Sequence, residues 1–401
     1  MSAAYPGGTG APFDDTPTRD IRPLPGDLAP PRGPGGEHDP GGPADGRSTE
    51  EVSCPRCQAP VGVWDQFCEA CGHELTPPVV SSGTPGYVAE CPVCAADPDA
   101  PEGGVTPDGY CEVCGRKVPS DRDHVEVDLG LLAGVSDRGR RHSRNEDAMA
   151  LATSRSPAGR PVALAVVCDG VSTSPRPDEA SLAAARSAVR VLLSAARTGA
   201  DPQHASVQAL HTASARLAEV AGEDGAPACT YASAIVGPDE VTVCWLGDSR
   251  VYWLAVAGDD ERPAVDVTTQ PMATRSGRLA SCLLTRDDSL AAELVTNGLM
   301  SEDEAMASPQ AHVITQWLGA DFPDPQAHVA QFKPAGAGAL LICSDGLWNY
   351  RSEAADLASL ALPAGLTAPL DAVTTLVKVA NDAGGRDNIT AVLVPFPPST
   401  P

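Results

Sequence analysis

Two strand-like apolar runs of this sequence end in acidic residues. The run ALAVVCDG ends on Asp169-Gly170, and the run ALLICSDG ends on Asp345-Gly346. A carboxylate at the end of a buried strand is costly to desolvate unless a partner pairs with it. The repetition of this arrangement indicates that the two carboxylates share a purpose.

Three further acidic stretches join them: SRNEDA carries Glu146 and Asp147, LGDSR carries Asp248, and GGRDNIT carries Asp387. Any one of these stretches alone is more typical of a turn than of a ligand. Convergent carboxylates raise each other's pKa unless cations lie among them. Oxygen ligands with few histidines suit Mg²⁺ or Mn²⁺, and a two-metal site activates water for attack on phosphorus. The five stretches together therefore favour a metal site.

The elements that position these acids are readable from their patterns. The sequence predicts helices over 178–197, 204–220, 290–296 and 370–381, and a further helix opened by a Ser301–Glu304 capping box. It also predicts two strands around the Gly-Asp-Ser-Arg turn within 241–254 and a closing strand, ITAVLV. Hairpins mixed with paired helices favour an α+β fold over a βαβ repeat.

The N-terminal third differs in composition. Residues 1–50 are rich in Pro, Gly and Asp, and we expect them to be disordered. Residues 51–78 and 88–118 contain cysteine pairs, and residues 121–396 read as the main domain.

Eight of the 13 cysteines form four Cys-x-x-Cys pairs in two clusters. The first cluster contains Cys54, Cys57, Cys68 and Cys71, and the second contains Cys91, Cys94, Cys111 and Cys114. Two such pairs supply the four thiolates of a tetrahedral zinc site, so the pattern predicts two zinc ribbons, each with one structural Zn²⁺. Lys and Arg are scarce between residues 51 and 120, which favours docking to a protein over binding to nucleic acid.

The whole chain has 401 residues and a formal net charge of −25. This charge argues against partners that need a basic surface, namely nucleic acid and anionic membrane. The sequence shows no secretory signal and no apolar run long enough to span a membrane. We therefore expect a cytoplasmic protein.

The motifs, in chain order, resemble those of the type 2C metal-dependent protein serine/threonine phosphatases, the PPM family. They are Asn145-Glu146-Asp147, Asp169-Gly170, Gly247-Asp248-Ser249-Arg250, Ser344-Asp345-Gly346 and Gly385-Arg386-Asp387-Asn388. The resemblance covers about residues 125–396. It implies a β-sandwich of two antiparallel sheets flanked by helices, with metals at one end.

The resemblance also implies roles. Asp169 bridges two Mn²⁺ or Mg²⁺ ions, Asp345 and Asp387 complete the first site, and the Gly170 carbonyl completes the second. Glu146, beside Asp147, holds water ligands of the second metal. Asp248 with Asp345 matches the position of a third, weaker metal. In the family, a metal-bound hydroxide attacks phosphoserine or phosphothreonine directly.

Two features depart from the family pattern. His142 stands where the family commonly has an arginine that clamps the substrate phosphate, and Arg141 is a flanking candidate for that role. His142 is either a substrate-facing or a solvent-facing residue. The second departure is the run VSTSPRPDEAS, which replaces the glycines expected after Asp169-Gly170.

Two functions follow. The first is an active phosphatase acting on phosphoprotein, with its zinc ribbons docking a partner such as a cognate Ser/Thr protein kinase. The alternative is an inactive phosphatase-like adaptor that binds phosphoprotein without turnover. Decayed enzymes lose ligand carboxylates first, and all of them are present here, which favours the enzyme.

Overall fold

The computed structural model describes one main stretch of the chain and several short ones. The main stretch comprises residues 109–222, 225–256, 280–308, 310–322, 324–334 and 336–398. The short ones are residues 51–53, 56–57, 59–62, 68, 70–71, 80–81, 91–95, 103–106 and 275–277. The tail predicted over residues 1–50 lies outside the described residues.

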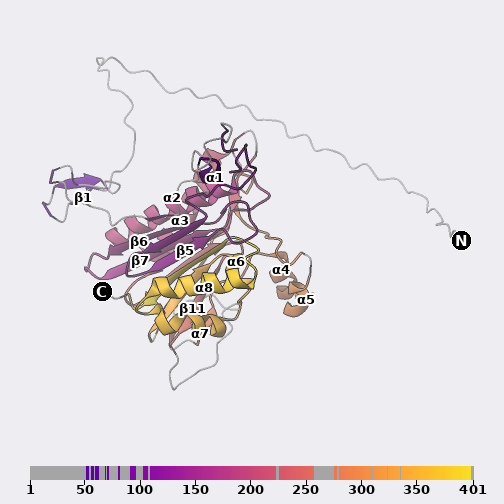
Figure 1. Cartoon of the computed structure of the whole chain (residues 1–401). Coiled ribbons are helices and arrows are strands. Elements are labelled where there is room, and N and C mark those ends of the chain that lie inside the picture. Colours follow the sequence, from indigo (N-terminus) through magenta and orange to yellow (C-terminus); the bar gives the residue numbers. More distant parts are fainter. Residues whose placement is uncertain are drawn as a thin grey trace, which may run out of the picture. The chain divides into compact units, whose positions relative to one another are not determined.

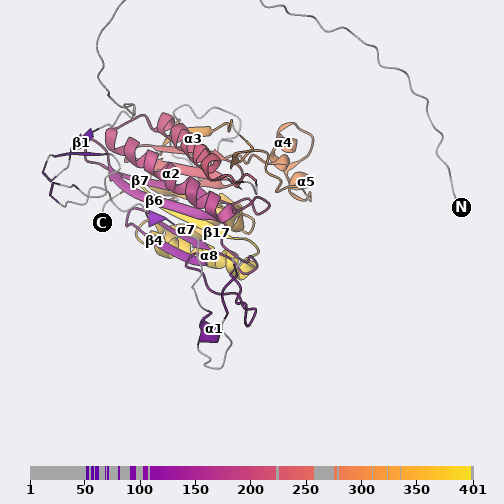
Figure 2. The same cartoon turned by 90° about the horizontal axis from the view of Figure 1, so that it is seen from above.

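Two large sheets form the centre of the fold (Figures 1 and 2). One has the order β12 (Arg275–Gly277), β15 (His328–Pro334), β10 (Val241–Leu246), β9 (Tyr231–Val236), β7 (Pro161–Cys168), β6 (Ala148–Arg155) and β3 (Val80–Ser81). The other has the order β13 (Cys282–Leu283), β11 (Arg250–Ala255), β16 (Gly338–Cys343), β17 (Ile389–Phe396), β5 (Ala133–Asp137) and β4 (His124–Asp128). All pairings in these sheets are antiparallel except that of β12 with β15.

Helices cover the outer face of each sheet, as Figure 2 shows. Helices α2 (Pro177–Thr198) and α3 (Pro202–Val220) pack on the seven-stranded sheet, and α7 (Ala354–Gly365) and α8 (Pro369–Ala383) pack on the six-stranded sheet. The shorter helices are α1 (Pro92–Ala95), α4 (Leu290–Thr296), α5 (Glu302–Met306) and α6 (Asp345–Trp348). Two small sheets pair β1 (Glu51–Ser53) with β2 (Pro60–Gly62) and β8 (Ala228–Cys229) with β14 (Leu318–Gly319).

The central strands, such as β7, β9, β16 and β17, are apolar on both sides because the sheets are covered on both faces there. In β7, Leu164 and Val166 pack toward α2 and α3, whereas Ala163 and Ala165 pack between the sheets. This period of two places alternate residues in different core layers. An uninterrupted apolar run such as VALAVVC therefore becomes a strand with no solvent-facing side.

The predicted α+β sandwich is confirmed, and so are its main elements. The predicted helices correspond to α2, α3, α4 and α8 with ends shifted by at most a few residues, and Ser301 and Glu304 form the predicted capping box at α5. The predicted strands correspond to β10, β11 and β17. In the described part of the chain, none of the helices combines the length and the apolar character needed to cross a membrane.

Candidate metal centre

The predicted acidic ligands lie at one end of the sandwich because of the strand pairing. Asp169 follows the end of β7, and Asp147 precedes the start of β6; these strand ends are joined by the pairing of Cys168 with Ala148. In the other sheet, Asp345 follows β16 and Asp387 precedes β17, which are likewise antiparallel neighbours. The turn that carries Asp248 runs from β10 in one sheet to β11 in the other.

The carboxylates at this end interact strongly with one another. Desolvation raises the pKa of Asp169 well above its usual value, and so does repulsion from four other carboxylates, those of Asp147, Asp345, Asp248 and Asp387. Desolvation and repulsion by Asp248 and Asp387 raise the pKa of Asp345 in the same way. The structure thus brings together the carboxylates that the sequence motifs singled out.

Burial adds to the cost of this arrangement. Asp147 is fully buried, and desolvation raises its pKa to about 6. Asp248 is 6% exposed, and desolvation, with repulsion from Asp287, raises its pKa to about 7. Ser344 Oγ donates to Asp147 Oδ2 at 2.7 Å, whereas Asp147 Oδ1 is buried without a hydrogen-bond partner among the described residues. An unpaired buried carboxylate oxygen among repelling carboxylates fits a site built for cations.

The carboxylate oxygens are more widely spaced than the cysteine sulfurs described below. Within the described ranges, three or more ligating atoms from His, Cys, Asp or Glu lie mutually within 4.8 Å only at the two cysteine clusters.

Gly170 lies where no side chain fits. A Cβ at this position would lie 2.6 Å from the carbonyl oxygen of Pro177 and 2.7 Å from that of Glu146. The Glu146 carboxylate is nearly buried, and it accepts hydrogen bonds from Arg144 Nε at 2.8 Å and from Ser172 Oγ. The run after Gly170 therefore places Ser172 directly on a predicted site residue.

Asn388 links three segments of the site, a role that the sequence analysis missed. Its Oδ1 accepts the backbone N–H of Glu146 at 2.7 Å, and its Nδ2 donates to the carbonyls of Arg138 and Arg144 at 2.8 and 3.0 Å. Its position directly after Asp387 in the GGRDN motif was the available signal.

The turn around Asp248 is held by an arginine and a tryptophan. Arg250 Nη2 and Asp287 Oδ2 are 2.8 Å apart, and the guanidinium lies 3.7 Å from the ring centroid of Trp348. Trp348 Nε1 donates to the Asp248 carbonyl at 3.0 Å. Trp348 is the last residue of α6, and Asp345 is the first. The contacts thereby fix Asp248 relative to Asp345.

His142 points toward a predicted ligand. Its Nε2 lies 3.1 Å from Asp387 Oδ1, and its side chain is 27% exposed. Arg141 is exposed, and Arg140 pairs with Asp382 at 3.0 Å. Of these three residues, His142 therefore has the direct contact with the acidic group.

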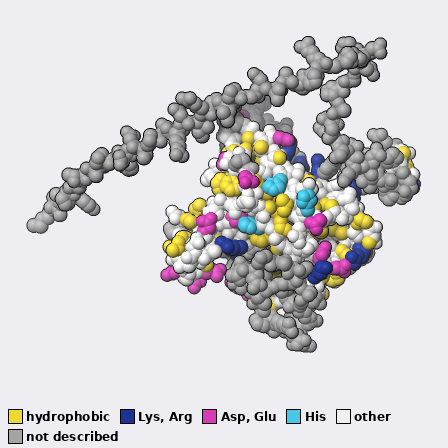
Figure 3. All heavy atoms as spheres, turned by 180° about the vertical axis from the view of Figure 1, so that it is seen from behind, with side chains coloured by type: hydrophobic (Ala, Val, Ile, Leu, Met, Phe, Trp, Pro, Cys, Tyr) yellow, Lys and Arg dark blue, Asp and Glu magenta, His cyan; other side chains and the backbone are white. Residues whose placement is uncertain are grey.

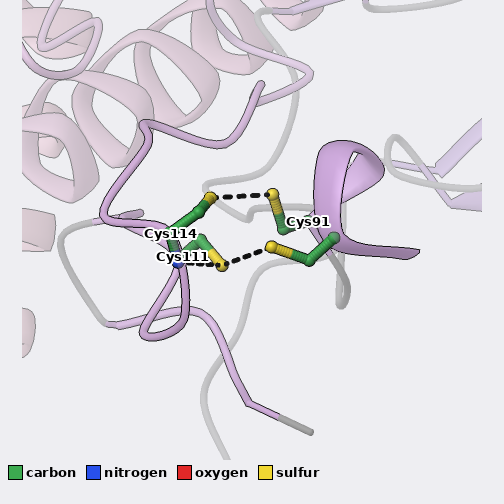
Figure 4. A group of neighbouring side chains, drawn as sticks. Cys91, Cys111 and Cys114 are labelled. Carbon is green, nitrogen blue, oxygen red and sulfur yellow. Dashed lines mark hydrogen bonds between the residues drawn. The ribbon is translucent and has the colours of Figure 1, made fainter. Parts of the chain in front are cut away.

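The second cysteine cluster forms a compact set of four thiols (Figure 4). The sulfurs of Cys91 and Cys114 are 3.7 Å apart, and those of Cys94 and Cys111 are 3.6 Å apart. A tetrahedron with metal–sulfur bonds of about 2.3 Å has edges of about 3.8 Å, so these spacings fit a tetrahedral four-thiolate site. The backbone N–H of Cys114 also donates to Cys111 Sγ at 3.5 Å, a hydrogen bond that supports a ligating sulfur.

The first cluster is described in part. Cys57, Cys68 and Cys71 have sulfurs within 4.8 Å of one another, and those of Cys57 and Cys68 are 3.5 Å apart. Cys54, the predicted fourth ligand, lies outside the described residues. The three described thiols are arranged as a partial ligand shell.

Comparison with known proteins places this geometry in a family. The family model described as "Protein phosphatase 2C" matches residues 136–393. Protein phosphatase PhpP of Streptococcus pneumoniae is 39% identical over 113 residues, which are 28% of this chain and 44% of that protein. Serine/threonine phosphatase stp of Listeria innocua is 32% identical over 166 residues, which are 41% of this chain and 55% of that protein. The chain thus spans about half the length of the curated relatives it matches.

Solved structures agree on the fold. A single-site variant of a bacterial serine phosphatase superposes with a TM-score of 0.52 at 22% identity, covering 67% of this chain and 98% of that one. Serine/threonine phosphatase Stp1 from Staphylococcus aureus gives a TM-score of 0.50 at 22% identity, covering 67% of this chain and 96% of that one. The sandwich with its flanking helices is shared with both.

Asp169→Asn is expected to stabilise the protein when divalent cations are removed. The substitution replaces a desolvated carboxylate with a neutral amide and so removes its repulsion with four other carboxylates. The free energy of unfolding in EDTA at pH 8 should therefore rise by about 0.5–2 kcal/mol. Urea unfolding measures this change, with Asp324→Asn at an exposed position as the control. A lower stability of Asp169→Asn in EDTA contradicts the electrostatic account.

Proposed function

The chain belongs to the protein phosphatase 2C family, and we propose that it is a metal-dependent phosphatase acting on phosphoserine or phosphothreonine in proteins. One observation carries the proposal. Carboxylates from five separate segments meet at one end of the sandwich and repel one another, and Asp147 Oδ1 is buried without a hydrogen-bond partner in the described part of the chain. This costly arrangement is understandable as a cation site.

The residues divide into ligands and groups that hold them. Asp169, Asp345 and Asp387, with the Gly170 carbonyl, would hold two Mn²⁺ or Mg²⁺ ions, and Asp248 would serve a third. Glu146 and Asp147 would face the same ions through water or directly. Bound metal lowers the pKa of a coordinated water and neutralises the substrate phosphate. The protein's own part is to hold the carboxylates at fixed positions.

His142 is the proposed contact to the substrate phosphate. Its Nε2 lies 3.1 Å from Asp387 Oδ1, and both side chains are partly exposed to solvent. Imidazole lacks the fork of donors of an arginine, so we propose that it binds phosphate less tightly than the family's usual residue. Arg141, exposed on the same turn, is the second candidate.

The adaptor alternative has less support. It requires a site that binds phosphoprotein without activating water, whereas the sequence retains every carboxylate of the motifs. No single observation favours it, so turnover is the proposed function.

We propose that the N-terminal clusters bind structural Zn²⁺ and dock a protein partner, with a Ser/Thr protein kinase as the candidate.

Lys and Arg form small separate groups on the face in Figure 3, interspersed with acidic side chains. The described residues on that face form no continuous basic surface for nucleic acid. We also propose that the protein works in the cytoplasm, where cysteine pairs stay reduced and available to metal.

The decisive assay is hydrolysis of a phosphothreonine peptide by the full chain with and without Mn²⁺. We expect turnover only with the metal, and Asp345→Ala should lower kcat/KM by about 10²–10³-fold because a ligand is lost. Asp356→Ala, at an exposed helix start, is the control. Binding of Mn²⁺ without turnover on any phosphopeptide would favour the adaptor.

His142→Arg is expected to lower KM for the same peptide about tenfold, since arginine adds a charge-assisted contact to phosphate. His142→Ala should raise KM. Steady-state kinetics at saturating Mn²⁺ measures both effects. If neither changes KM while Arg141→Ala raises it, the phosphate contact belongs to Arg141.

The purified full chain is expected to contain about two equivalents of zinc, one for each set of four cysteines. Cys111→Ser should lose one equivalent and expose the second cluster to protease, because a segment with so little apolar core depends on metal to fold. Metal analysis and limited proteolysis measure this, with Cys282→Ser outside the clusters as the control. An unchanged zinc content of Cys111→Ser would contradict the assignment.

A further inference from the structure

Arg122 carries a buried guanidinium that no motif predicted. The residue is 2% exposed and precedes β4. Its Nη1 donates to the Asp178 carbonyl at 2.8 Å, its Nη2 donates to the Asp147 carbonyl, and its Nε is buried without a hydrogen-bond partner among the described residues. A charge buried at this cost needs a reason beyond packing.

The two carbonyls belong to segments that form the acidic site. Asp147 directly precedes β6, and Asp178 lies in the first turn of α2. Ser181 Oγ connects the same segments, donating to the carbonyls of Glu146 at 2.5 Å and Asp178 at 3.2 Å. Arg122 therefore links the start of β6 to the start of α2 by hydrogen bonds.

Gly170 lies close to the same two segments, at the start of β6 and the start of α2. The space for its missing side chain is taken up by the carbonyl oxygens of Pro177 and Glu146. Any shift of α2 away from β6 would therefore move the surroundings of Gly170 and its neighbour Asp169. The distance that Arg122 fixes is one on which the predicted ligands depend.

Charge adds to this role. The guanidinium is attracted to the carboxylates of Asp147 and Asp178. It is thus a fixed positive charge beside a group of carboxylates that repel one another. Its attraction to these carboxylates opposes the tendency of the acidic segments to move apart.

We propose that Arg122 is a positioning residue that holds the Asp147 and Asp178 segments in the geometry required for metal binding. The proposal rests on the proposed function. Arg122 lies just before β4 of the sandwich, outside the quoted motifs and before residue 136, where the match to the family model begins.

The test compares Mn²⁺ binding by the full chain with that of Arg122→Gln and Arg122→Lys, using isothermal titration calorimetry. Loss of a residue that orients ligands typically weakens metal affinity about 10–100-fold, which is the expected effect of Arg122→Gln. Arg122→Lys keeps the charge and should show a smaller loss. Arg155→Gln is the matched control, because Arg155 Nη1 also donates to a carbonyl, that of Gly159 at 2.8 Å, but on an exposed hairpin.

Comparing the melting temperature with the Kd for Mn²⁺ separates this role from a purely structural one. A structural residue would lower the melting temperature and leave the Kd for Mn²⁺ unchanged, and that result for Arg122→Gln would overturn the proposal. If Arg122→Gln does not fold, the Kd of Arg122→Lys decides in the same way.

The same measurements keep the two proposals apart. Mn²⁺ binding by the wild-type chain without peptide hydrolysis would contradict the proposed phosphatase activity, while the comparison of Kd values would still decide the role of Arg122. A wild-type chain that binds no Mn²⁺ would contradict both.

Discussion

The mutual repulsion of carboxylates at one end of the sandwich is the constraint on which the rest of this structure depends. Desolvation and neighbouring negative charge both raise the pKa of Asp169 and of Asp345. A fold that keeps such groups together without a counter-charge loses stability, so the arrangement must be held by the surrounding structure. The two covered sheets provide that support, because each acid follows or precedes a strand buried on both faces.

Hydrogen bonds from uncharged side chains support the sheets where the acids meet. Ser344 donates to Asp147 across the sheets, and Asn388 accepts the Glu146 N–H. Ser136 and Thr390 contact each other at 2.8 Å on adjacent strands beneath them. These partners add no negative charge, so they fix the backbone without increasing the repulsion. Their position at strand ends links the stability of the sheets to the geometry of the site.

The sequence was informative where a pattern has one structural reading. Apolar runs ending on Asp-Gly predicted the ends of β7 and β16, and capping and amphipathic patterns predicted the helices. Ser344 and Asn388 lay within quoted motifs, but their partners come from strands far away in the chain. Arg122 gave no signal, because an arginine before a strand reads as a surface residue until tertiary contacts bury it. The position of His142 on Asp387 likewise depends on two loops meeting, which no local pattern specifies.

The route of the chain into the site connects its parts. Val118 is 1% exposed, packs with Cys91 and Cys111, and donates its N–H to the Gly109 carbonyl at 2.8 Å. Asp123 then forms a turn with Ser120 at 2.9 Å. Arg122 stands within this turn, so only a few residues separate a packed cysteine cluster from a guanidinium buried at the acidic site. Short, hydrogen-bonded chain has little freedom to absorb movement. Folding of the second cysteine cluster therefore restricts the segment from which Arg122 reaches the carbonyls of Asp147 and Asp178.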